Sequence, residues 1–386
     1  MVSPDTIGQT YKEVFIMLIP DQNSLNKFNQ HARSLRIPLT LMMELTPRCS
    51  LDCKMCYVHL TREQMGDRKE LTAEQWKSVL DQAIEMGTMS VLMTGGECLM
   101  HKDFKEIYLY VLSKPVLLSL NTNATLINDD YIDFFAKNPP HRIKISLYGS
   151  SEEGYERVTG HRMYARVRDN ILKLKNVGIN IKIAITVCKQ SYDEAMDIVK
   201  FARDNHIEYS VDMAMYEAAE GTGRSSDDYS LTPEETAAKY LELKKLEGLP
   251  CFENEPTTEI PERLDNGEEV RGLQCGAGRT TCTVCWDGDL QPCLINKMGN
   301  TVNILDVSFK EGWERATQIV EEQLRPIECM TCKYAIICNP CSIYRSNPKD
   351  PGHCNPKVCK ITLAKLNAGV SRLLNEEEAK KYKAKP

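Results

Sequence analysis

Cysteine is the residue type through which this sequence could carry unusual chemistry. The chain has 386 residues and 16 cysteines, and they fall into two groups. Three lie within positions 49–56, ten lie between 275 and 359, and Cys98, Cys188 and Cys251 stand apart. The N-terminus shows no export signal, and thiols inside cells are normally kept reduced. We therefore interpret the two groups as ligands for metal ions or iron–sulfur clusters.

The first group lies in the segment Glu44-Leu-Thr-Pro-Arg-Cys49-Ser-Leu-Asp-Cys53-Lys-Met-Cys56-Tyr57. A 4Fe–4S cluster normally takes four cysteines, so three would leave one iron open to an external ligand. A methionine amino and carboxylate group could chelate that iron, and an electron from the cluster could break the adjacent sulfonium carbon–sulfur bond. The product would be a primary carbon radical. A zinc loop or reduced structural cysteines remain the alternatives on spacing alone.

Residues 39 to about 215 must position this loop. Short β-rich runs alternate there with amphipathic helical stretches, which is typical of βα units around a parallel sheet. Six units are too few for a closed eight-stranded barrel and suit an open, partial (β/α)6 TIM barrel of the α/β class, with its chemistry at the carboxyl ends of the strands. The six predicted strands are Leu39–Leu45, Ser90–Thr94, Val116–Leu120, Arg142–Leu147, Asn180–Val187 and Tyr209–Met213.

Local signals also predict several helix ends. Gly87 and Gly178 are suitable stop residues. Three pairs match the capping box that begins a helix, and Pro233 occupies the first helical position after the last of them. These pairs are Thr72 with Gln75, Ser191 with Glu194, and Thr232 with Glu235.

Composition limits the partners. The chain has 48 basic and 54 acidic residues, a net charge of −6 and 42% hydrophobic residues. This balance does not suggest a nucleic acid or an anionic membrane surface, and it favours a small-molecule, peptide or protein substrate. The best apolar run near the N-terminus, Val14 to Ile19, is too short to span a bilayer. We expect a globular, cytoplasmic protein.

The C-x-x-x-C-x-x-C-aromatic pattern that ends in Tyr57 resembles the signature of the radical S-adenosylmethionine (SAM) superfamily. Thr94-Gly95-Gly96-Glu97, at the end of the second predicted strand, resembles its glycine-rich motif that binds the amino group of the cofactor. The resemblance implies SAM and a 4Fe–4S cluster on Cys49, Cys53 and Cys56. It also implies a 5′-deoxyadenosyl radical.

Further cofactor contacts are implied by the same resemblance. Asn121-Thr122-Asn123 and Ser146-Leu147-Tyr148-Gly149 follow the third and fourth strands, where the family places polar contacts to the ribose and the methionine moiety. Arg157 is a candidate for the cofactor carboxylate. Ordinary turn chemistry and a solvated arginine are the alternatives. Cys98 replaces the usual proline after the glutamate, and we expect it to be a solvated loop thiol rather than an active-site group.

The second group of cysteines exceeds what one metal site needs. Eight of its ten thiols would complete two 4Fe–4S clusters, and a pair of zinc ribbons is the alternative on spacing alone. The pattern resembles the SPASM domain of radical SAM enzymes, which binds two auxiliary clusters. The resemblance implies Cys275, Cys282, Cys293 and Cys341 as ligands of the first, and Cys329, Cys332, Cys338 and Cys359 as ligands of the second.

Two departures leave this assignment open. Cys338 and Cys341 are separated by two residues, where the family usually has three, and Cys285 competes with Cys282. Cys354 is the reserve for Cys359. The resemblance covers most of residues 39–360. We expect an N-terminal extension (1–38), the partial barrel (39–216), a bridging helix and linker (217–272), the SPASM domain (273–360) and a C-terminal helix or tail (361–386).

SPASM enzymes mostly oxidise or crosslink peptides and proteins. The resemblance therefore implies a radical SAM peptide maturase that modifies a ribosomally made peptide, with a thioether as one outcome. Sulfatase-maturating relatives carry a catalytic aspartate where this chain has Leu294, which weakens that alternative. A flavodoxin or ferredoxin is the expected electron donor. The 38 N-terminal residues are too few for a winged-helix leader-binding module, so a separate recognition protein or the barrel itself would bind the leader.

Two rival classes fit the cysteines alone. A non-enzymatic iron–sulfur electron carrier would bind clusters without cleaving SAM, and a zinc-ribbon scaffold would contain zinc. Neither explains the glycine motif. The sequence identifies no catalytic acid, base or nucleophile.

Overall fold

A nine-stranded sheet forms the frame of the protein. The computed structural model describes residues 22–216, 225–251, 275–295 and 301–373, apart from positions 333, 335, 336, 339, 340, 342 and 348. The strand order is β6-β5-β4-β3-β2-β1-β7-β8-β9. The strands of this sheet are β1 (Thr40–Glu44), β2 (Ser90–Thr94), β3 (Leu117–Thr122), β4 (Arg142–Ser146), β5 (Ile181–Thr186), β6 (Glu208–Asp212), β7 (Thr281–Val284), β8 (Asp289–Gln291) and β9 (Val302–Asn303).

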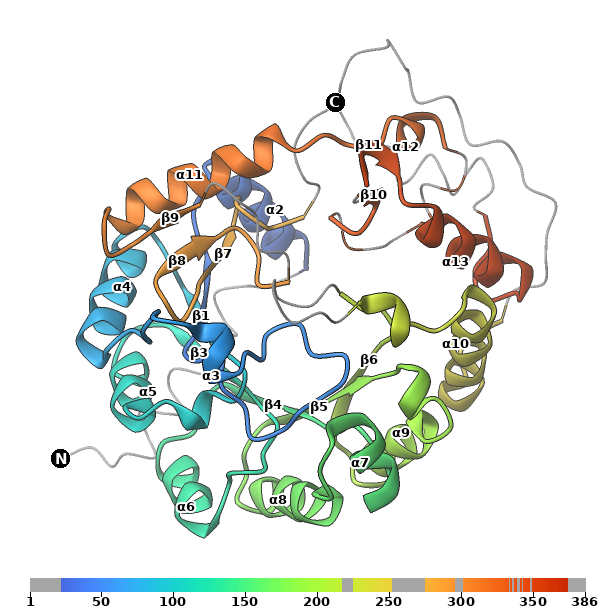
Figure 1. The fold of residues 1–386 in the computed structure, drawn as a ribbon, viewed down its shortest axis with the longest axis horizontal. Helices are drawn as coiled ribbons and strands as arrows, with labels where there is room; N and C mark the ends of the chain where they lie inside the picture. The colour runs from blue at the N-terminus through green and yellow to red at the C-terminus, as the bar shows by residue number, and fades with distance from the viewer. Residues whose placement is uncertain are drawn as a thin grey trace.

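The first six strands are all parallel and confirm the predicted partial barrel, with small differences at the strand ends. Helices cover the outer side of these strands (Figure 1). The helices of this region are α3 (Arg62–Met65), α4 (Ala73–Glu85), α5 (Phe104–Leu112), α6 (Asp129–Lys137), α7 (Glu152–Thr159), α8 (Tyr164–Asn176) and α9 (Ala195–Asp204). Three short 3₁₀ helices complete it, namely η1 (Cys98–Met100), η2 (Lys189–Ser191) and η3 (Ser226–Asp228).

Alternation along the strands decides which side chains enter the core. Leu41 and Met43 of β1 are fully buried, and Leu41 pairs with the equally buried Val91 of β2. These side chains share one hydrophobic cluster with Trp76 of α4 and Phe104 of α5, so this face of the sheet packs against the helices. Since successive side chains point to opposite faces, the intervening residues face the inside of the barrel.

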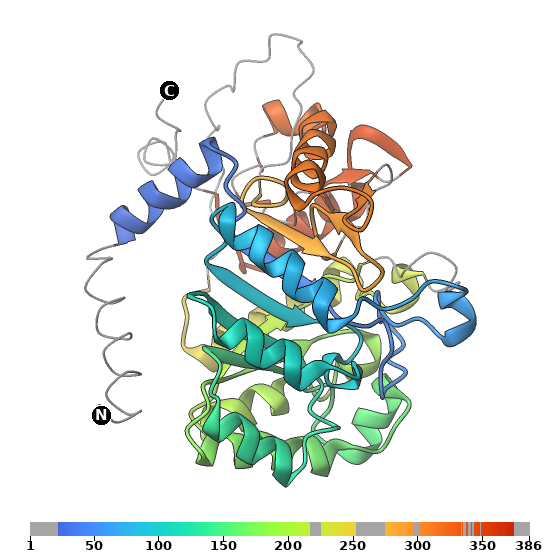
Figure 2. The ribbon, with the colours of Figure 1, turned by 90° about the vertical axis from the view of Figure 1, so that its left-hand side faces the viewer.

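The C-terminal segment continues the same sheet. β7 pairs with β1 in parallel, and β8 and β9 follow it as antiparallel strands. Helix α11 (Phe309–Glu322) covers this extension and lies beside α4 (Figure 2). The indole N–H of Trp313 donates to the Arg36 carbonyl at 2.8 Å, just after α2 (Gln22–Ser34). The predicted boundary near residue 273 lies outside the described residues.

The remaining C-terminal elements lie on the other side of the barrel mouth. They are the hairpin β10 (Ser346–Asn347) and β11 (Asp350–Cys354), the short α12 (Glu328–Thr331) and α13 (Pro356–Asn367). Helix α13 packs against α10 (Pro233–Glu247), which lies in the predicted bridge. Within the described ranges, no helix is both long enough and apolar enough to cross a membrane.

The capping boxes at Thr72 and Thr232 are confirmed, and Gly87 and Gly178 follow helix ends in positive-φ conformations. The third predicted box is wrong, because α9 begins at Ala195 and its N-cap residue, Glu194, makes no side-chain cap. The Glu194 carboxylate instead accepts from the Ser150 N–H at 2.7 Å and from Arg157. Glu194 therefore bonds to donors that are distant in sequence and does not form the predicted cap with Ser191.

The burial of Cys282 generates the first prediction. Cys282 pairs with Leu41 and is fully buried in the core, and burial raises its pKa to about 12. Cys282→Ser would place a hydroxyl group among apolar side chains, which costs about 1–3 kcal/mol. We expect a clearly lower Tm than that of the wild type. The exposed Cys251 is the control, and an equal Tm for Cys282→Ser and Cys251→Ser would contradict the core position.

Candidate cofactor site

The Cys49–Cys56 loop begins shortly after the carboxyl end of β1 and reaches helix α7. The Asp52 N–H donates to the Thr159 carbonyl and the Lys54 N–H donates to the Val158 carbonyl, both at 3.0 Å. The loop therefore runs along the last turn of α7. Cys53, between the two donors, is buried, whereas Cys49 and Cys56 are partly exposed.

Several N–H groups point at the thiols of this loop. The His59 N–H donates to Cys56 Sγ at 3.2 Å, and the Leu51 N–H donates to Cys49 Sγ at 3.5 Å. Asn123 Nδ2 lies 3.4 Å from Cys49 Sγ. Burial raises the pKa of Cys49 to about 12, while these donors act in the opposite direction because they stabilise the thiolate.

The glycine motif holds the loop by close backbone approach. The Gly96 N–H donates to the Thr46 carbonyl at 2.7 Å, and the Glu97 N–H donates to the Arg48 carbonyl at 2.8 Å. A Cβ atom on Gly95 would lie 2.5 Å from the Thr46 oxygen, and one on Gly96 would lie 2.3 Å from the Arg48 oxygen. Neither position has room for a side chain. The two glycines therefore pack the end of β2 against the start of the cysteine loop.

Glu97 joins the end of β2 to the end of β3. Its side chain is 1% exposed, and it accepts from Thr122 Oγ1 and the Asn123 N–H, both at 2.8 Å. Burial raises the pKa of Glu97, and these hydrogen bonds oppose that shift. Asn123, held in this way, reaches both Cys49 Sγ and Ser50 Oγ. Glu97 and Asn123 thus act on the cysteine loop through packing and hydrogen bonds.

Three other residues predicted to contact the cofactor lie on different parts of the barrel, namely Tyr57, Ser146 and Arg157. The Tyr57 ring is partly exposed and contacts Tyr216, just after β6, with 6.0 Å between ring centroids. Ser146 ends β4 and hydrogen-bonds to Tyr148. Arg157 lies on α7, and its guanidinium donates to Glu194 at 2.6 Å. A cofactor carboxylate would have to share Arg157 with Glu194.

Cys98 is not a solvated thiol, so that expectation was wrong. The residue is fully buried, and its Sγ lies 3.2 Å from the Asn121 carbonyl oxygen. It is the first residue of η1, and this short helix contacts β3. Burial raises the pKa of Cys98 well above its usual value, and the neighbouring Glu97 adds to this effect.

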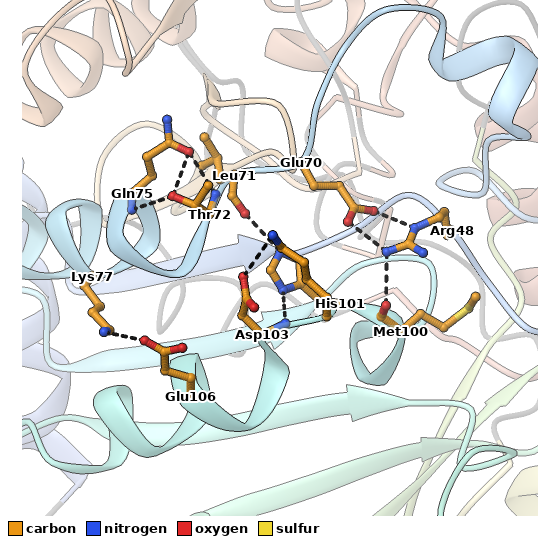
Figure 3. A network of polar contacts seen from close by, with 11 residues as sticks. Arg48, Glu70, Leu71, Thr72, Gln75, Lys77, Met100, His101, Asp103 and Glu106 are labelled. Atoms are coloured by element: carbon orange, nitrogen blue, oxygen red, sulfur yellow. Dashed lines mark hydrogen bonds and ion pairs between the residues drawn. The ribbon is translucent and has the colours of Figure 1, made fainter.

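A second set of contacts supports the loop from the other side, and sequence reasoning missed it (Figure 3). Arg48 donates to both carboxylate oxygens of Glu70 at 2.8 Å and to the Met100 carbonyl at 3.0 Å. The buried His101 ring lies 2.9 Å from the Leu71 carbonyl oxygen through Nε2 and accepts from the Asp103 N–H through Nδ1. No spacing rule marks Arg48 or Glu70, because their pairing spans 22 positions.

The donor set fits an anionic iron–sulfur cluster. Three thiols share one short loop, and backbone and amide N–H groups point at two of them. The hydroxyl of Tyr155, fully buried on α7 one turn before Thr159, has no hydrogen-bond partner in the described structure. Burial raises its pKa well above the usual value, and the charges of the Cys53 and Cys49 thiols add to the effect. A cluster sulfur would supply the missing acceptor.

The C-terminal cysteines form two neighbourhoods. Cys354 Sγ lies 3.0 Å from Cys359 Sγ. The pKa values of Cys329, Cys354 and Cys359 are each shifted by the charges of neighbouring thiols, and these thiols belong to the set Cys329, Cys332, Cys338, Cys354 and Cys359. Elsewhere, Cys275 and Cys293 pack against Ala277 and Val320, and Cys293 and Cys341 both lie close to Tyr216.

No group of three or more His, Cys, Asp or Glu side chains in the described ranges is placed to share a single metal ion.

The close packing at Gly96 generates the second prediction. Gly96→Ala would force the Arg48 backbone away, which costs about 1–3 kcal/mol and displaces the cysteine loop. We expect a lower Tm and less iron bound after anaerobic reconstitution. Gly178→Ala is the control, because its strain is confined to a positive φ in open space and costs about 1 kcal/mol. Wild-type iron content in Gly96→Ala would show that the glycine is not needed to hold the loop.

Comparison with known proteins agrees with this geometry. Residues 43–215 match the family model of the radical SAM superfamily. The PqqA peptide cyclase of Bradyrhizobium diazoefficiens is 28% identical over 47% of this chain and 47% of its own length. The subtilosin biosynthesis protein AlbA of Bacillus subtilis is 26% identical over 71% of this chain and 59% of its own length. This chain therefore spans about half to three fifths of those two relatives.

Solved structures show the same fold. The crystal structure of Streptococcus suis SuiB superimposes with a TM-score of 0.61 at 20% identity, over 90% of this chain and 87% of its own. The structure of anSMEcpe with bound AdoMet gives a TM-score of 0.63 at 17% identity, over 85% of this chain and 96% of its own. Residues 43–215 are therefore similar to the radical SAM superfamily, and this chain shares the fold of these solved structures.

Proposed function

We propose that this chain is a peptide maturase that introduces an oxidative modification or crosslink into a ribosomally made peptide. The observation that carries the proposal is the position of the second group of cysteines. Cys282, Cys285 and Cys293 of that group lie in or directly beside β7 and β8, which extend the same sheet that carries the Cys49–Cys56 loop. Relatives support it, because the PqqA cyclase is named for its peptide and SuiB has been solved with the precursor peptide SuiA.

The cofactors, when bound, supply a carbon radical that can remove a hydrogen atom from the substrate. The protein's own residues bind and orient. Cys49, Cys53 and Cys56 hold the cluster, and Gly95 and Gly96 leave backbone bare beside the loop. Tyr57, Ser146 and Arg157 are the proposed contacts to SAM, while Glu97 and Asn123 keep the loop in place. Tyr155 would donate a hydrogen bond to the cluster from α7.

We propose two auxiliary clusters in the C-terminal segment. For the first, Cys275, Cys293 and Cys341 are retained, and the strand geometry favours Cys285 over Cys282 as the fourth ligand. Cys282 and Val284 point into the helix-facing core, so alternation directs Cys285, directly after β7, toward the opposite face. For the second, Cys329, Cys332 and Cys338 are joined by Cys359 or its neighbour Cys354.

Leu294 follows Cys293 where sulfatase-maturating enzymes have an aspartate, so formylglycine formation is the second candidate. The likeness to anSMEcpe supports the fold and does not favour that reaction. A thioether crosslink remains within the proposed class. The clusters must be reduced, so we propose a flavodoxin- or ferredoxin-type electron donor and a cytoplasmic location. A separate leader-binding protein is the further proposed partner.

Removal of a cluster ligand tests the proposed radical chemistry. With SAM and a strong reductant, the wild-type protein should release 5′-deoxyadenosine, and Cys53→Ala should lower that release at least a hundredfold. Cys188→Ala is the matched control, because Cys188 is also buried and its Sγ lies 3.6 Å from Ser191 Oγ, outside the cysteine loop. Release by Cys53→Ala at the wild-type rate would rule out this loop as the cluster site, and an inactive wild-type protein would favour a simple electron carrier.

Iron analysis tests the auxiliary clusters. Three 4Fe–4S clusters imply about twelve irons per chain, and about four would exclude the two auxiliary sites. Cys285→Ala should lose about four irons or convert the first auxiliary cluster to a form with an altered electron paramagnetic resonance spectrum. Cys282→Ala should keep its iron and change stability alone. The reverse pattern would return the ligand role to Cys282.

A further inference from the structure

A cavity of about 230 Å³ lies at the carboxyl end of β6, between α10 and α13. Asp212 and Tyr216 line it from the barrel, Tyr240 from α10, and Lys365 from α13. The Tyr216 ring contacts Tyr57 on one side and Tyr344 on the other, with 6.0 and 6.1 Å between centroids. The cavity therefore adjoins the residue that directly follows Cys56.

Lys365 is the unusual group in this cavity. Its ammonium lies over the Tyr240 ring, 4.2 Å from the centroid, and it forms no ion pair with any described residue. Burial lowers its pKa, the nearby Lys244 lowers it further, and the Cys338 thiol acts in the opposite direction. A partly buried ammonium without a carboxylate partner costs free energy, part of which an anion in the cavity would recover.

The other charged groups in and near the cavity already have partners. Lys357 forms an ion pair with Asp227 and also donates to Ser230 Oγ. Lys244 donates to the Val370 carbonyl at 2.6 Å. The Asp212 carboxylate accepts from the Ala214 N–H at 2.9 Å and makes no ion pair with Lys365. Among the described residues, Lys365 is thus the lining cation for which no ion pair with a carboxylate is seen.

Apolar side chains complete the wall. Met213, Met215, Leu231 and Val358 line the cavity and are buried. An inorganic anion would leave these surfaces without contacts, whereas a carboxylate on a short hydrocarbon stem would use both the apolar wall and the ammonium. The Tyr240 ring lies beside Lys365 and offers a further apolar surface against which the hydrocarbon stem could pack.

We propose that this cavity binds a carboxylate-bearing residue of the peptide substrate, with Lys365 as the group that recognises the carboxylate. The inference rests on the proposed peptide-maturase function and adds a specificity determinant to it. The carboxylate belongs either to an aspartate or glutamate side chain or to a peptide C-terminus. Both carry the same chemistry, and the two sources can be separated by the probe.

Binding can be measured on the cluster-loaded protein before any turnover. The probe is N-acetyl-glutamate N-methylamide, compared with N-acetyl-glutamine N-methylamide of nearly the same shape, and saturation-transfer NMR gives the affinities. We expect the glutamate probe to bind at least tenfold more tightly. N-acetyl-alanine with a free carboxylate represents a C-terminus, and tighter binding of it than of the glutamate probe would assign the site to a chain end. Equal binding of the glutamate and glutamine probes would overturn the proposal.

Variants then assign the effect to one residue. Lys365→Gln should weaken binding of the glutamate probe at least tenfold and leave the glutamine probe unchanged, whereas Lys365→Arg, which keeps the charge, should bind within a few-fold of wild type. Lys360→Gln is the matched control, because Lys360 is exposed on the same helix. Wild-type affinity in Lys365→Gln would exclude Lys365. If the wild type does not release 5′-deoxyadenosine, the proposed function is wrong. The binding result does not depend on that release and would still hold.

Discussion

The close approach of two backbone segments at Gly95 and Gly96 is the constraint on which the rest of the site depends. Carbonyl oxygens of Thr46 and Arg48 occupy the space that side chains would need there. Because the N–H groups of Gly96 and Glu97 bond to those same oxygens, the end of β2 fixes the start of the cysteine loop. The motif therefore has a packing role in addition to the cofactor contact that the family resemblance implies.

Glu97 extends this constraint to the third strand. A carboxylate at 1% exposure is costly unless hydrogen-bonded, and the donors come from Leu99, Thr122 and Asn123. The same interaction orients Asn123 toward Cys49. Together with Arg48 and Glu70 on the other side, it surrounds the loop with interactions from several elements. The thiols are thus positioned by tertiary contacts, whereas their own segment contains little regular structure.

The C-terminal segment shows how one strand register can separate two similar cysteines. Cys282 and Cys285 are three positions apart, and both are buried. The pairing of Leu41 with Cys282 assigns Cys282 to the helix-facing core, and alternation assigns Cys285 to the other face. The same segment brings Cys293 and Cys341 near Tyr216, so the barrel mouth is bordered by both cysteine groups and by the Lys365 cavity.

The sequence by itself determined the partial barrel, the cysteine loop and two capping boxes, because strand alternation, thiol spacing and caps are local properties. It could not determine the burial of Cys98, the loss of the Ser191–Glu194 box or the Arg48–Glu70 support, since each depends on partners distant in sequence. Nor could it choose between Cys282 and Cys285. The different faces of these two residues, on which the proposed choice of Cys285 rests, became visible only when β7 paired with β1, because the register of a strand is a tertiary property.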